Sequence, residues 1–208
     1  MRKWGWIALA LLALAAIGFF VIAPGRIEAG MNRIDGKPLI AVGAEARALH
    51  ATLTIVDLHS DTLMWDRDLT QRSSRGHEDL PRLQAGNVAL QVFSSVTKTP
   101  RGINYDANSG DSDNITLLAL AHLQPPRTWR SLLERSLFHG EKLDRAVAGS
   151  RGALVKVADD AALDALLAAR PRAVARSAGC SASRACRTLR GTCAISTGST
   201  PRASAWPG

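Results

Sequence analysis

The most pronounced pattern along the chain is an uncharged apolar run near its start, from Trp4 to Ala23. As a helix, its 20 residues span about 30 Å, the thickness of the hydrocarbon core of a membrane. We therefore predict a transmembrane signal anchor over residues 1–23, ended by Pro24 and Gly25.

Two basic residues, Arg2 and Lys3, precede this run, and positive residues favour the cytoplasmic side of a membrane. We therefore expect single-pass anchoring in the cell membrane, with the later residues on the non-cytoplasmic (periplasmic or extracellular) side. A cleaved signal peptide is the alternative. It is less favoured because the apolar run exceeds the usual core of about 7–15 residues, and residues 27–29 make a poor cleavage site.

Residues 24–50 are predicted to be a linker, and residues 51–169 alternate strand-like and helix-like patterns. The predicted strands are 53–58, 88–96 and 152–157, and the predicted helices are 79–84, 113–123, 127–147 and 160–169. This order favours parallel strands with helical crossovers. Three strands do not close a (β/α)8 barrel, which takes about 250 residues. The predicted fold class is α/β: an incomplete (β/α)8 TIM-like barrel preceded by an N-terminal transmembrane helix.

The longest predicted helix, 127–147, carries apolar residues at helical spacing. We expect its apolar face to consist of Trp129, Leu132, Leu133, Leu137 and Leu143.

The net charge of +8 belongs to the end of the chain. Seven of the 26 basic residues lie in 170–208, which has no acidic residue, so residues 1–169 hold 19 bases against 18 acids. All three cysteines also lie in 170–208, which leaves the remainder without disulfide or thiolate chemistry. A nearly neutral body beyond a membrane anchor argues against a nucleic-acid partner.

Candidate chemistry lies at the end of the first predicted strand, where Asp57, His59 and Asp61 are two residues apart. Alternate side chains of a strand share a face, and imidazole nitrogens and carboxylate oxygens are good Zn²⁺ ligands. A polar strand end with a hydrogen-bonded histidine is the alternative. Three further histidines, His77, His122 and His139, lack ligand-like pairing, and most of them are expected at the surface.

Two ordered motifs resemble one family. Residues 54–62 (Thr-Ile-Val-Asp-Leu-His-Ser-Asp-Thr) resemble the opening metal-binding strand of the membrane dipeptidases, the renal-dipeptidase-like zinc peptidases, which typically reads Asp-Gly-His-Asn-Asp. Residues 76–95, with Asp-Leu-Pro-Arg-Leu, a glycine and then Gln-Val-Phe-Ser-Ser, resemble the family's next motif in order and distance. The resemblance covers roughly residues 50–169.

The resemblance implies a (β/α)8 barrel with two zinc ions and a dipeptide substrate. It makes His59 and Asp61 ligands of the first zinc, and Asp57 at most a carboxylate that orients them. A bridging glutamate and two further histidines are expected on later strands. Metal lowers the pKa of bound water towards about 7 and polarises the scissile carbonyl.

Residues 170–208 are predicted to be a disordered basic tail, because they hold almost no large aliphatic side chains. The tail is further interpreted as translated out of frame. GC-rich codons chosen for residues 176–185 and regrouped by one base read Val-Gly-Gly-Leu-Leu-Gly-Val-Glu-Gly, which resembles the family's strand with the bridging glutamate. A functional basic tail that binds nucleic acid or acidic lipid is the alternative.

The sequence thus indicates a membrane-anchored zinc dipeptidase that hydrolyses dipeptides, present as a truncated and inactive fragment. Two alternatives remain open. One is a non-catalytic, membrane-anchored interaction protein in which residues 50–169 fold alone. The other is a related metal-dependent hydrolase of amides or lactones.

Overall fold

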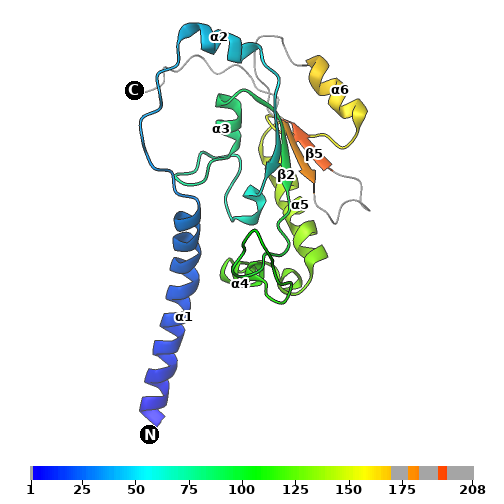
Figure 1. Cartoon of the computed structure of the whole chain (residues 1–208). Helices are drawn as coiled ribbons and strands as arrows, with labels where there is room; N and C mark the ends of the chain where they lie inside the picture. Colours follow the sequence, from blue (N-terminus) through cyan, green and yellow to red (C-terminus); the bar gives the residue numbers. More distant parts are fainter. Residues whose placement is uncertain (1, 170–177, 183–191, 196–208) are drawn as a thin grey trace. The chain divides into compact units, whose positions relative to one another are not determined.

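A computed structural model of the chain describes residues 2–169, 178–182 and 192–195 (Figure 1). For 178–182 and 192–195 it describes the backbone alone. The chain divides into two compact units. Unit 1 comprises the chain up to Arg33 together with Thr97–Arg135, and unit 2 comprises Ile34–Val96 and the chain from Ser136 onward.

The first element of unit 1 is helix α1, Arg2–Met31. Its apolar stretch is long enough to cross a membrane, and none of that stretch is buried. The prediction that Pro24 and Gly25 end the helix is wrong, because α1 continues through Pro24 to Met31. Proline removes one backbone donor, but its fixed φ is helical, and apolar helices of this kind tolerate it.

Unit 1 continues with helix α4, Asn114–Ala121, and the short 3-10 helix η2, Pro126–Trp129. The side chain of Asp113 caps α4 by accepting a hydrogen bond from the backbone N–H of Ile115, at 2.9 Å. The helix predicted over 113–123 is therefore confirmed within two residues at each end.

A buried arginine, Arg135, holds this part of unit 1 together. Its guanidinium pairs with Asp113 at 2.6 Å and donates to Thr116 Oγ1 at 2.6 Å. It also donates to three backbone carbonyls, those of Thr97, Thr128 and Trp129. Burial alone would raise the pKa of Asp113, but the hydrogen bonds from Arg135, Thr116 and a backbone N–H outweigh burial and lower the pKa.

Unit 2 is built on a five-stranded sheet in the order β1-β2-β4-β3-β5. The strands are β1 Ile55–Ser60, β2 Val88–Ser94, β3 Val155–Lys156, β4 Ala178–Ala182 and β5 Thr192–Ile195. The pairs β1–β2, β2–β4 and β3–β4 are parallel, whereas β5 runs antiparallel to its neighbours. A mixed class of helices and a sheet, preceded by one apolar N-terminal helix, is thereby confirmed, and the incomplete (β/α)8 barrel stays a prediction.

The remaining elements of the described chain are α2 Ala44–Thr52, the 3-10 helix η1 Thr62–Met64, α3 Leu80–Ala85, α5 Leu132–Gly149 and α6 Asp160–Ala169. Helix α2 occupies the end of the predicted linker. Its C-terminal end is fixed to the turn before β2, because the side chain of Asn87 donates to the carbonyls of His50 at 2.6 Å and Leu53 at 3.2 Å.

The main core of unit 2 lies between the sheet, α3 and α5. Its buried residues are Leu63, Leu69, Leu80, Leu83, Phe93, Leu143, Ala146 and Leu154. Strand β1 contributes little to it, since Leu58 is 72% exposed and Val56 is also exposed. A strand predicted to be buried is therefore the exposed edge of the described sheet.

The apolar face predicted for the long helix is partly wrong. In α5, Leu132, Leu133 and Leu137 are exposed, whereas Arg135, His139 and Leu143 are buried. The expectation of a surface position for His139 is corrected with it. Both polar side chains are buried because they have partners, and the His139 Nδ1 lies 2.7 Å from Ser95 Oγ.

Two strands, β4 and β5, lie within the tail predicted to be disordered. The backbone of β4 pairs in parallel along β2, and disorder of the tail as a whole stays a prediction. The rest of the predicted tail lies outside the described residues, and its out-of-frame origin stays a prediction.

We predict that Arg135→Met lowers the free energy of unfolding by about 3 kcal/mol, because it leaves a carboxylate and several carbonyls without their donor. The matched control is Arg130→Met at an exposed site, which should cost little. Chemical denaturation of both variants in detergent, followed by circular dichroism, measures the difference. Equal stability of the two variants would show that the Arg135 contacts contribute little.

Candidate metal site

The candidate site lies where β1 ends beside β2. The two parallel strands pair with a register shift between Asp57 and Ser60, where three steps along β1 match two along β2. Such a bulge places one extra residue in β1 and redirects its side chains. Simple alternation therefore does not decide where the polar side chains at this strand end point.

His59 and Asp61 nevertheless converge. The His59 Nε2 lies 3.1 Å from Asp61 Oδ1, and the two side chains are 71% and 44% exposed. Two ligands of one tetrahedral zinc ion, each about 2.1 Å from the metal, lie roughly 3.4 Å apart. The separation and the donor types suit a shared metal ion, and they also suit a direct hydrogen bond or ion pair.

Asp57 points elsewhere. Its Oδ1 accepts a hydrogen bond from the backbone N–H of His59 at 3.0 Å. In this arrangement Asp57 stabilises the bulged backbone under His59. The predicted role of orienting the metal ligands would act through that backbone.

Ser94, the last residue of β2, joins the two strand ends. Its Oγ lies 2.9 Å from the carbonyl oxygen of Ser60 and 3.4 Å from His59 Nε2, and it contacts Asp61 Oδ1. One hydroxyl proton can serve only one of these acceptors at a time. Ser94 can therefore orient the carboxylate of Asp61 by donating to it.

Glu78 supplies a buried carboxyl group beside these strand ends. Its Oε2 accepts a hydrogen bond from Ser60 Oγ, and its Oε1 is buried without a hydrogen-bond partner in the described part of the chain. The pKa of Glu78 is raised to about 7, because burial and the nearby charge of Asp57 outweigh the hydrogen bond from Ser60 and the charge of Arg67, which lower it. The group can therefore hold or release a proton near neutral pH.

The loop that carries Glu78 is fixed by Arg67. The guanidinium donates to the carbonyls of Arg75 and Glu78 and to Thr62 Oγ1. It passes so close to Gly76 that a Cβ there would lie 2.0 Å from Nη1, and Gly76 has a φ of +79°. Only glycine meets both conditions.

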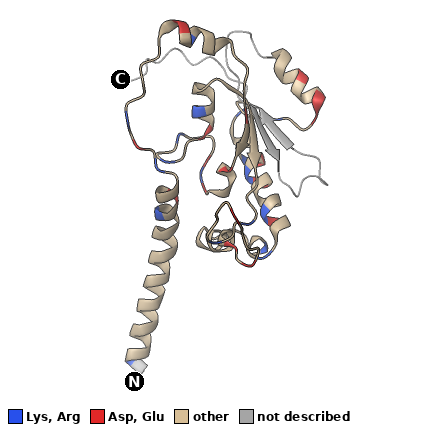
Figure 2. Ribbon diagram, viewed as in Figure 1, with Lys and Arg blue, Asp and Glu red and all other residues tan. Residues whose placement is uncertain are grey.

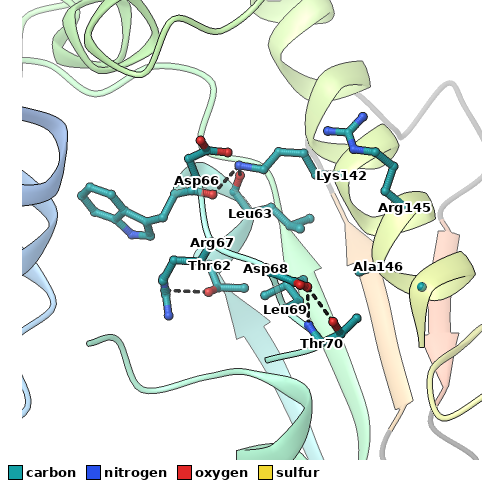
Figure 3. Close-up of a pocket in the computed structure, with 12 residues that line it drawn as sticks. Thr62, Leu63, Asp66, Arg67, Asp68, Leu69, Thr70, Lys142, Arg145 and Ala146 are labelled. Atoms are coloured by element: carbon teal, nitrogen blue, oxygen red, sulfur yellow. Dashed lines mark hydrogen bonds between the residues drawn. The ribbon is translucent and has the colours of Figure 1, made fainter. Parts of the chain in front are cut away.

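A cavity of about 370 Å³ lies between the segment 62–70 and α5 (Figure 3). Lys142 reaches from α5 across it and donates to the carbonyls of Leu63 and Trp65. Neither His59 nor Asp61 lines this cavity. The cavity and the two candidate ligands are therefore separate features of unit 2.

The donor set for a metal is incomplete within the described residues, which contain no group of three or more His, Cys, Asp or Glu side chains placed to hold an ion. His77 is exposed on the loop before α3, His122 lies at the end of α4, and His139 is buried beside Ser95. His59 and Asp61 thus fit part of a zinc site.

No family model, curated protein or solved structure matches the chain. The dipeptidase resemblance therefore rests on the two motifs in the sequence.

Sequence reasoning did not single out Ser94 or Glu78. Ser94 could have been found, because it ends the strand expected to neighbour the first, and the carboxyl ends of parallel strands share an edge. Nothing in the sequence indicated that Glu78 is buried, since glutamate is usually exposed.

Because the folded chain favours the neutral form of Glu78, we predict that stability falls as pH rises from 4.5, the ordinary pKa of a glutamate, through about 7. The full loss is roughly 3 kcal/mol. Glu78→Gln keeps a neutral group of the same shape at every pH. The free energy of unfolding of this variant, relative to that of the natural chain, should therefore increase across this range. Denaturation midpoints at several pH values, with Glu45→Gln as the exposed control, measure it. A constant difference between Glu78→Gln and the natural chain would contradict burial of the carboxyl group.

Proposed function

We propose that the chain is the amino-terminal part of a membrane-anchored, zinc-dependent dipeptidase, with His59 and Asp61 as its first two metal ligands. The observation that supports this most directly is the 3.1 Å approach of His59 Nε2 to Asp61 Oδ1 at the carboxyl end of β1. Exposure of both side chains leaves them accessible to an ion and a substrate.

The position of the pair agrees with the chemistry proposed. Parallel α/β folds bind ligands at the carboxyl ends of their strands, and both β1 and β2 end at this point. When bound, zinc supplies a bound water of lowered pKa and polarises the scissile carbonyl. His59 and Asp61 hold the ion, and Ser94 orients the carboxylate of Asp61.

The exposed edge of β1 supports a larger sheet. Its apolar side chains Val56 and Leu58 face solvent in the described residues, although such side chains are usually covered in parallel sheets. We infer that the proposed barrel has further strands, which would carry the bridging glutamate and the second pair of histidines. The tail of the present chain would replace them through a shift of frame.

Membrane anchoring has its own support. Helix α1 can span a bilayer by length and composition, and Arg2 and Lys3 precede its apolar run. Under the positive-inside rule the candidate metal site lies on the non-cytoplasmic side.

Zinc titration tests the site. In a chain whose three cysteines are replaced by serine, zinc should shift the ring signals of His59 in a proton–nitrogen NMR spectrum. Asp61→Asn should weaken this response severalfold, because it removes the carboxylate charge. His77→Ala, on the exposed loop, is the control. A response of His59 that survives Asp61→Asn unchanged would exclude a shared ion.

Activity assays and the encoding DNA test the dipeptidase proposal. The chain of 208 residues should not hydrolyse dipeptides with or without zinc, since two protein ligands hold a catalytic zinc poorly. A one-base change near codons 170–178 should restore a longer frame whose product does hydrolyse them, and His59→Ala should abolish that activity. If the DNA has no such restoring change, the out-of-frame interpretation fails.

A further inference from the structure

Helix α4 and helix α1 are in contact within unit 1. The part of α1 that loses exposure is its C-terminal end, where Glu28 is buried and Pro24 and Gly25 are half-buried. Because the apolar run itself is unburied, we take α4 to pack on the turns of α1 that follow it.

This contact fixes the level of α4 relative to a membrane. If the run from Trp4 to Ala23 fills the hydrocarbon core, the later turns of α1 rise through the headgroup layer. From Pro24 to Met31 the helix rises only about 12 Å. Figure 2 shows that α1 is uncharged over most of its length, and its C-terminal end carries one basic and one acidic residue, Arg26 and Glu28. A helix packed on those turns lies beside the headgroups.

Helix α4 exposes apolar side chains near its C-terminal end. Ile115, Ala119 and Ala121 are buried, whereas Leu117 is 55% exposed and Leu123, just beyond the helix, is 65% exposed. Helix α4 has eight residues and no charged side chain, which is unusual for a helix that faces water. Its buried residues pack against the protein, and its exposed leucine has no cover.

Leu123 has a backbone conformation that normally selects glycine. Its φ is +48°, and the N–H groups of Leu123 and Gln124 close the helix on the carbonyls of Leu120 and Ala119 in the manner of a Schellman cap. A leucine in this conformation is strained, and its exposed side chain gains little packing in return. An apolar environment outside the protein would make this choice of residue favourable.

The charges around this surface suit phosphate headgroups. Arg26 in the last turns of α1, Arg33 just after the helix and Arg130 just after η2 are exposed. Basic residues at a membrane surface are attracted to anionic lipids.

We propose that the outer face of α4, through Leu117 and Leu123, lies in the headgroup layer against the acyl chains of the membrane that α1 crosses. Unit 1 then contacts lipid through two elements: α1, which spans the membrane, and α4, which lies at the membrane interface. The proposal rests on the membrane anchoring in the proposed function and is independent of zinc chemistry.

Spin labels on the full chain in vesicles of phosphatidylcholine and phosphatidylglycerol test this. The three cysteines are replaced by serine, and labels are placed by Leu117→Cys, Leu123→Cys, Ala15→Cys as a reference within α1, and Leu58→Cys as an equally exposed leucine in unit 2. Relaxation by oxygen reports lipid, and relaxation by a nickel chelate reports water. The ratio of oxygen to nickel accessibility at 117 and 123 should be severalfold higher than at 58 and lower than at 15.

Four outcomes would overturn the proposal. If the ratio of oxygen to nickel accessibility is as low at 117 and 123 as at 58, α4 lies in water. If the ratio is high at all three positions, the chain adsorbs to the vesicles non-specifically. Protection of 117 and 123 from both reagents would indicate a protein partner or a second copy instead of lipid. A water-exposed label at 15 would exclude the anchoring itself, which distinguishes failure of the anchor from failure of the α4 contact.

Discussion

Parallel pairing of β1 with β2 is the interaction on which the candidate site depends. It brings the carboxyl ends of two strands together, so that Ser94 from one meets Asp61 and His59 from the other. Because β1 is bulged, strand alternation alone does not set the direction of the His59 and Asp61 side chains, and their contacts with β2 do so. At the same time β1 is the edge of the described sheet, and its leucine and valine, Leu58 and Val56, are exposed.

Buried polar groups organise both units, and they do so by different means. Arg135 is fully compensated by one carboxylate, one hydroxyl and three carbonyls, so its charge can remain in the interior. Glu78 has less compensation, with one buried oxygen unpartnered in the described chain, and it responds by a raised pKa. The contacts of Arg135 rigidify a loop and a helix, whereas Glu78 keeps a proton that it releases near neutral pH.

The two units also suggest a division of roles. Unit 1 contains the helix that can span a membrane and the apolar helix α4 in contact with it, whereas unit 2 contains the sheet and the candidate ligands. Within the proposed function, unit 1 would provide the lipid contacts and unit 2 the chemistry. Each role rests on residues of its own unit.

The sequence by itself determined the apolar helix, the approximate positions of α3 and α4 and of strands β1 and β2, and the choice of His59 and Asp61 as candidates. These follow from local patterns: a long uncharged run, apolar stretches between breakers, and β-branched runs. Tertiary structure alone decided that α1 passes through Pro24, that α5 buries Arg135 and His139 in place of Leu133 and Leu137, and that Glu78 is enclosed. Burial of a polar side chain depends on partners far away in the sequence, and no local pattern contains them.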